Sequence, residues 1–226
     1  MKTKSKNQKK KNTDTWLPIV LGVLMIAVVV GLVLLFSNLS NRASESAGDG
    51  ELVDYEEQGL IELADYQNPG IEILSEEDSD DPPGALWDDY IEKCKSKKLP
   101  EDLTEEAYAD TVKEYEGFAE VSGITYEELL NEYSMTEDTV VSVAEDTVMG
   151  RLAAKTIALR ESITVDDATM EAQLMELMGY EEADREPLDD LIEDYVENYG
   201  SRPRDDVYVE VVKQWLYDRE KDRAGQ

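Results

Sequence analysis

The apolar stretch over residues 16–36, WLPIVLGVLMIAVVVGLVLLF, limits most what this chain can fold into, because it contains no charged residue. About 20 helical residues span the roughly 30 Å hydrocarbon core of a bilayer. Trp16 and Leu17 begin the stretch and Phe36 ends it, with Trp16 placed for the membrane interface. A cleaved signal peptide is the competing interpretation, but its apolar core is usually only about 7–15 residues long. We therefore expect an uncleaved transmembrane helix that contacts the lipid bilayer.

The charges on either side of this stretch predict its orientation. Arg42 is the only nearby positive charge after it, whereas six lysines precede it: Lys2, Lys4, Lys6, Lys9, Lys10 and Lys11. Positively charged flanks stay in the cytoplasm. We therefore expect a single-pass cell-membrane protein with a basic cytoplasmic tail, residues 1–15, and an extracytoplasmic C-terminal domain.

Composition excludes several classes of function. The chain has 22 basic and 53 acidic residues, so its surface would repel the phosphates of nucleic acids. It has no histidine, and its single cysteine, Cys94, cannot form an intrachain disulfide. We interpret Cys94 as a small apolar residue rather than a reactive thiol. The P-loop, GxSxG, HExxH and CxxC motifs are also missing, so we expect no catalytic residues, metal site, cofactor or small-molecule substrate.

Residues 37–83 are expected to form an acidic, flexible linker. Residues 37–51 are rich in Ser, Asn and Gly, which is typical of a tether. Residues 60–74 place two short apolar runs around Asn68, Pro69 and Gly70, which predicts a short β-hairpin. Residues 75–84, SEEDSDDPPG, lack the glycine and closing glutamate of an EF-hand loop, which favours a solvated linker over a calcium site.

From residue 84 to residue 222 the pattern is helical, which predicts an all-α domain. Seven helices are expected. The first contains Leu86 and Ile91; the second is capped by Thr104 and ends before Gly123; the third opens with the capping box Thr125–Glu128; the fourth runs from Thr136 to about residue 161; the fifth opens at Thr164 with Asp167 and ends at Gly179; the sixth spans about residues 186–199; the seventh starts near Pro203.

The fourth predicted helix mixes apolar and basic residues. Its apolar stripe consists of Val141, Ala144, Val148, Leu152 and Leu159. Arg151 and Lys155 project into the same sector. Either their stems lie along the apolar surface while the charges reach water, or they pair with carboxylates of a neighbouring helix. The sequence alone leaves both explanations open.

Four segments in order resemble the C-terminal domain of bacterial trigger factor. They are ALWDDYIEKCKSKKLPEDL (85–103), YEGFAEVSGITYEELLNEYSMTEDTV (115–140), LRESITVDDATMEAQLMELMGY (159–180) and VENYGSRPRDDVYVEVVKQWLYD (196–218). The resemblance implies a SurA-like helical domain whose arms hold unfolded chains. The membrane stretch stands where that family carries its ribosome-binding module. The family's isomerase domain would lie between Ile73 and Leu86, where far too few residues remain for any domain, so we expect no isomerase activity.

The fifth predicted helix is rich in methionine, whose flexible thioether suits varied apolar partners. Two explanations stay open for its apolar residues: contact with client polypeptides, or ordinary core filling. The residues concerned are Met170, Leu174, Met175, Leu177, Met178 and Tyr180.

Together these observations predict a membrane-tethered, ATP-independent chaperone or holdase. Its partners would be unfolded or nascent secreted polypeptides outside the cytoplasmic membrane. The alternative is a structural or regulatory envelope protein whose helical domain binds one specific protein partner.

Overall fold

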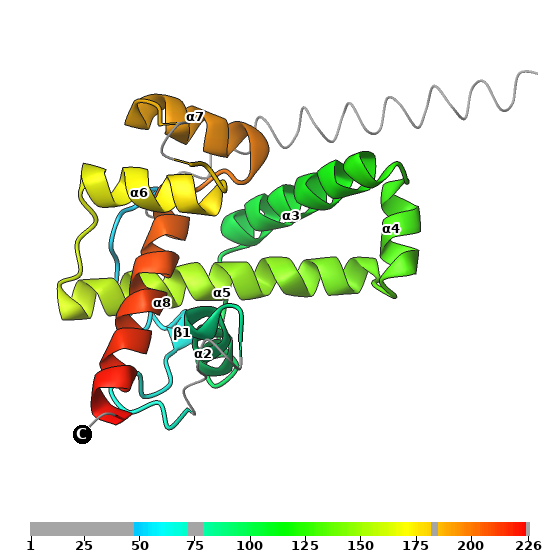
Figure 1. Ribbon diagram of the computed structural model, residues 1–226. Helices are drawn as coiled ribbons and strands as arrows, with labels where there is room; N and C mark the ends of the chain where they lie inside the picture. Colours follow the sequence, from blue (N-terminus) through cyan, green and yellow to red (C-terminus); the bar gives the residue numbers. More distant parts are fainter. Residues whose placement is uncertain (1–47, 72–78, 182–184, 225–226) are drawn as a thin grey trace, which may run out of the picture. The chain divides into compact units, whose positions relative to one another are not determined.

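The computed structural model describes residues 48–71, 79–181 and 185–224, which all fall within one compact unit, Glu45–Gln226. The expected membrane stretch, residues 16–36, lies outside the described residues. Within the part of the chain that is described, no helix combines the length and apolar character needed to cross a membrane. This part is mostly helical (Figure 1), so the expectation of an all-α fold is confirmed for it.

The helices follow one another along the chain with short connections. They are α2 (Pro82–Ile91), α3 (Glu101–Ser122), α4 (Tyr126–Glu132), α5 (Glu137–Glu161), α6 (Asp167–Leu177), α7 (Leu188–Asn198) and α8 (Pro203–Ala224). Two very short strands, β1 (Ile61–Glu62) and β2 (Lys95–Ser96), are the only regular extended pieces among the described residues.

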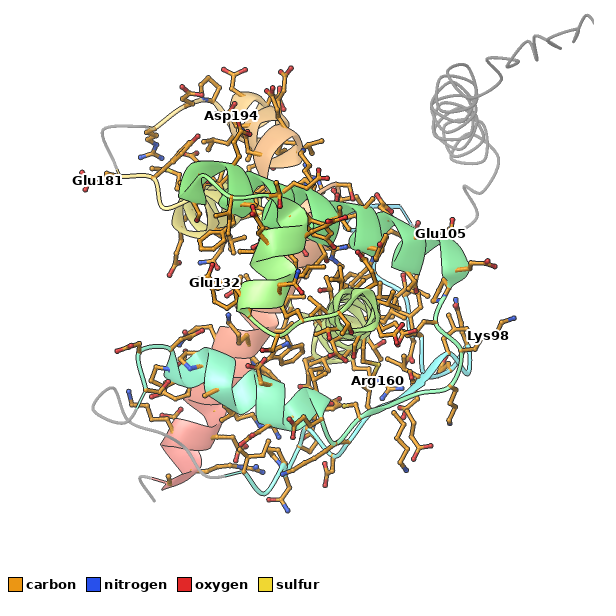
Figure 2. All side chains as sticks on the ribbon, turned by 90° about the vertical axis from the view of Figure 1, so that its right-hand side faces the viewer. Lys98, Glu105, Glu132, Arg160, Glu181 and Asp194 are labelled. Atoms are coloured by element: carbon orange, nitrogen blue, oxygen red, sulfur yellow. The ribbon has the colours of Figure 1, made fainter. Side chains whose placement is uncertain are left out.

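Helix α5 is the element around which the others pack. α2, α3 and α8 all contact it, and α8 crosses it in Figure 1. Every residue from Val148 to Ala158 is buried, and side chains surround α5 when it is viewed along its axis in Figure 2. A helix enclosed on all sides needs no single apolar stripe. The predicted stripe is accordingly only partly right, because Val141 and Leu159 are 40% and 43% exposed.

Residues 48–71, here called the strap, complete the main core without forming a helix. The side chains of Tyr55 and Ile61 are buried, and Tyr55 N donates a hydrogen bond of 3.1 Å to Thr156 Oγ1 on α5. Arg160, labelled in Figure 2, forms ion pairs with Asp54 and Glu56 of the strap. The prediction of a flexible linker is therefore wrong for residues 48–71, because they bury apolar side chains against α5. Residues 37–47 and 72–78 lie outside the described residues.

The predicted hairpin within residues 60–74 is also corrected. β1 pairs antiparallel with β2, which follows α2, so that Ile61 lies opposite Ser96. The amides of Lys97 and Lys98 both donate to Leu60 O and extend this pairing. Of the second expected strand, Ile71 is described and is not in a strand, and the remaining residues lie outside the described ranges. The segment after α2 thus supplies the partner strand that the sequence pattern placed directly after the turn.

Three helix boundaries agree with the capping signals. Thr125 and Glu128 form the predicted capping box of α4, and Thr136 caps α5 by accepting from Thr139 N. α3 ends at Gly123, whose φ of 71° suits glycine because a Cβ disfavours the left-handed region.

Two predicted helix starts are wrong. α3 begins at Glu101, one turn earlier than expected, and the Thr104 hydroxyl donates to Pro100 O instead of capping the helix. α6 is capped by Asp166, which accepts from Thr169 N, rather than by Thr164. In both cases several cap-forming residues or a proline lie within one turn, so that the local pattern permits more than one start.

The burial of the strap gives a direct test of the fold. Ile61→Ala should lower the free energy of unfolding by about 2–5 kcal/mol, because Ile61 is 0% exposed and its loss leaves a cavity. Gln58→Ala, at an exposed position of the same segment, should change it by no more than about 0.5 kcal/mol. Chemical denaturation followed by circular dichroism measures both, and equal stability of the two variants would contradict the docked strap.

Candidate functional site

Charged side chains are buried where α8 begins. Arg151 of α5 forms a bidentate ion pair with Asp206, with Nε 2.6 Å from Oδ1 and Nη2 2.9 Å from Oδ2. One turn further along α5, Lys155 Nζ lies 2.8 Å from Asp205 Oδ1. Arg202 Nε lies 2.6 Å from the other Asp205 oxygen. These five residues are called the α8 cluster. They confirm the second explanation for Arg151 and Lys155, pairing with carboxylates of a neighbouring helix.

The strap caps α8 from a distant part of the chain. The residue before α8 is Arg202, whose side chain cannot accept hydrogen bonds from the free amides of the first turn. Asp49 accepts them instead, at 2.9 Å from Asp205 N and 3.3 Å from Arg204 N. Gly50 N donates in turn to Asp205 Oδ1 at 2.8 Å. Asp49 thus acts as an N-cap supplied by the strap.

The electrostatics of the α8 cluster are those of a structural joint. Burial raises the pKa of Asp49, and the neighbouring Asp205 carboxylate also raises it, against the lowering effect of the accepted amide bonds. Burial lowers the pKa of the Arg151 guanidinium, but the Asp206 carboxylate outweighs burial and the net pKa is raised. Asp49, and Glu106 at 3.5 Å from Arg202 Nη1, add two carboxylates to Asp205 and Asp206, so each of the three cations has a carboxylate close by. With each carboxylate engaged, the cluster offers no free acid or base for catalysis.

The methionine-rich residues of α6 lie in a second core between α6, α7 and α8. Met170 and Leu174 are 0% exposed and Met178 is 7% exposed. Met175, Leu177 and Tyr180 are partly buried against the same core. The structure thus supports core filling for this set, and these side chains do not form an open apolar surface.

Cys94 lies at the edge of the main core. Ala64 N donates to its Sγ at 3.3 Å, and burial raises the pKa of the thiol. A raised pKa lowers the fraction of reactive thiolate. This supports the interpretation of Cys94 as a structural residue.

Apolar side chains do reach solvent at the corner where α4 joins α3 to α5. Phe118 and Val121, near the end of α3, are 52% and 89% exposed, and Tyr133, just after α4, is 57% exposed. The rings of Phe118 and Tyr133 meet edge to face with centroids 6.4 Å apart. With Val141 of α5, these residues are called the α4 corner. The Phe118–Tyr133 contact places two of these exposed side chains side by side, and adjoining exposed apolar side chains are typical of a binding surface.

The local sequence explains why the apolar side chains of the α4 corner are exposed. Leu129 and Leu130 of α4 are 2% and 8% exposed, so they anchor the short helix from below. Ala119 lies on the buried side of α3, whereas the side chains of Phe118 and Val121 lie on its exposed side. Their positions off the buried stripe were a signal in the sequence that our prediction of client contacts missed.

A groove of about 820 Å³ separates α2 from α5. Trp87 and Ile91 of α2 and Val143 and Met149 of α5 supply much of its apolar lining. No group of three or more Cys, Asp or Glu within residues 48–71, 79–181 and 185–224 is arranged to hold a metal ion. The apolar lining makes the groove a candidate for binding organic groups.

Comparison with known proteins gives no relative for this chain. No protein-family model matches it, no curated protein matches it in sequence, and no solved structure matches its fold. The resemblance to trigger factor therefore remains a prediction.

The α8 cluster leads to a stability prediction. Asp205→Ala should lower the free energy of unfolding by about 3–5 kcal/mol, because it leaves Lys155 and Arg202 buried without their main counter-charge. Asp222→Ala, at an exposed site near the end of α8, should have an effect below about 0.5 kcal/mol. Urea denaturation at neutral pH compares them, and a loss below about 1 kcal/mol for Asp205→Ala would contradict the structural role.

Asp49 leads to a prediction about pH. Because its pKa is raised in the folded state, the folded protein binds this proton more tightly than the unfolded chain. The Asp49 contribution therefore falls as pH rises from the unfolded value of 3.8 through the folded value. Asp49→Asn keeps an acceptor for the amides, so its stability relative to wild type should increase across that range and then level off. Denaturation curves from acid to neutral pH test the sign, and the opposite trend would contradict the burial of a charged Asp49.

Proposed function

We propose that this protein is a membrane-tethered, ATP-independent holdase that binds unfolded segments of secreted polypeptides outside the cytoplasmic membrane. The observation that carries the proposal is the α4 corner, where four large apolar side chains are at least 40% exposed. Burying apolar surface is worth roughly 25 cal/mol per Å², with little demand for a particular sequence. Such a surface suits reversible contact with many unfolded chains.

The charge of the chain supports the same function. A net charge of −31 keeps a complex with an aggregation-prone client soluble, because the complexes repel one another. The resemblance of residues 85–220 to the chaperone domain of trigger factor points in the same direction. The lysine-flanked apolar stretch over residues 16–36 supplies the anchor and the outward orientation.

The proposal predicts that the α4 corner is needed to hold clients. The full chain in nanodiscs should suppress the light scattering of a chemically denatured protein, without ATP. The triple variant Phe118→Ser, Val121→Ser and Tyr133→Ser should lose most of this activity, because it removes apolar surface but leaves the buried Leu129 and Leu130 in place.

The control is matched for site number and exposure. Glu105→Ser, Glu114→Ser and Glu132→Ser changes three exposed polar positions on α3 and α4 and should leave suppression intact. A wild-type chain that suppresses no aggregation would overturn the proposal. Capture of one partner in fixed stoichiometry, with no effect on unrelated denatured proteins, would favour the specific envelope partner instead.

The proposed orientation predicts accessibility from outside the cell. In a Cys94→Ala background, a cysteine at exposed Glu105 should react with a membrane-impermeant maleimide on intact cells. A cysteine at Ser5, within the lysine-rich tail, should react only after lysis. The reverse pattern would contradict the outward orientation.

A further inference from the structure

The groove between α2 and α5 has a floor and a rim of different chemistry. Its floor is apolar, and Trp87 and Met149 there are 6% and 5% exposed. Gly150 also lines the groove, next to Trp87: a Cβ at that position would make ordinary contact with Trp87 Nε1 at 3.7 Å. A volume of about 820 Å³ is within the range of pockets that enclose organic ligands.

The rim is acidic on both sides. Asp88 on α2 and Glu92 just after it form one side, and Glu145 and Asp146 on α5 form the other, and all four are exposed. Within the described residues none of these four carboxylates forms an ion pair, whereas Arg151, the one basic residue of the lining, is neutralised by Asp206. Burial raises the pKa of Asp88, and nearby Asp81, Asp89 and Glu92 add to that against Lys213. Lys213 acts on Asp88 from outside the lining, but the four rim carboxylates outnumber it, so the rim keeps a net negative charge.

We propose that this groove binds a short extended peptide segment in which one large apolar side chain is flanked by lysine or arginine. The apolar side chain lies on the Trp87–Met149 floor, and the flanking cations lie between the carboxylates of α2 and those of α5. The proposal rests on the proposed holdase function and adds to it the class of client segment that is selected.

Charge decides among the occupants. Nucleic acid and anionic lipid carry the same sign as the rim, so their approach is unfavourable. A second copy of this chain carries −31 charges and is disfavoured for the same reason. Only a ligand that combines positive charge with apolar surface matches both the rim and the floor.

The test uses the full chain in nanodiscs of zwitterionic lipid, with empty nanodiscs as the blank. The probe is a capped, fluorescein-labelled peptide with a central Phe between Lys-Lys pairs in a Gly-Ser background. Fluorescence anisotropy should show binding that is about tenfold weaker when the lysines are replaced by glutamates, and about tenfold weaker when Phe is replaced by Ser.

Two variants alter the groove by different means. Thr147→Trp fills it without a change of charge, since Thr147 is a partly exposed lining residue. Glu145→Lys with Asp146→Lys reverses one rim at exposed positions. Each should weaken binding of the lysine peptide by about tenfold. The control, Glu105→Lys with Glu114→Lys, makes the same charge change on α3 and should bind as wild type does. Figure 2 shows Glu105 on the opposite side of the picture from α2.

The outcomes separate this inference from the holdase function. If both groove variants bind the lysine peptide as wild type does, or if the peptide without Phe binds equally well, the groove is not the site. Aggregation suppression by wild type would then leave the holdase function standing on the α4 corner. If the groove variants lose the peptide but wild type suppresses no aggregation, the peptide site stands and the holdase function fails.

Discussion

The start of α8 is the contact on which the rest of the described structure depends. The N-terminus of α8, with its free amides, packs against α5. Three buried cations and their carboxylates lie at the same contact. Asp49 caps the amides, Arg151 and Lys155 of α5 pair with the two aspartates, and Tyr195 of α7 donates to Asp206 at 3.1 Å. One set of polar contacts therefore ties the strap, α5, α7 and α8 together. Because charges in this setting are stable only when paired, the contact specifies one arrangement of these elements.

The capping residue Asp49 lies close in sequence to the expected anchor. Eleven residues, 37–47, lie between Phe36 and the first described residue, Gly48, and at about 3.5 Å each they span no more than about 40 Å. Under the proposed function, the domain is thus held close to the membrane where secreted chains emerge.

Sequence patterns predicted the parts of this structure that depend on local physics. Helix existence, the capping box at Thr125, the cap at Thr136, and the stop at Gly123 follow from neighbouring residues. Contacts between distant segments were not predictable in this way. The cap from Asp49 to α8 and the pairing of β1 with β2 join residues far apart in sequence, and nothing in the strap's composition marks it as core. For the candidate site, the methionines indicated the wrong surface, because α6 packs against α7 and α8 and buries them. Phe118 and Val121, in contrast, lie off the buried stripe of α3.

Val121, the most exposed large apolar residue described, offers the most direct measurement of the central claim. A photo-crosslinking amino acid placed there in living cells, followed by a pulse and chase of newly made protein, records what touches the α4 corner and for how long. The holdase function predicts crosslinks to many different secreted proteins during the pulse, which disappear in the chase as those proteins fold. Crosslinks to a single protein that persist through the chase, or only to lipid, would contradict it.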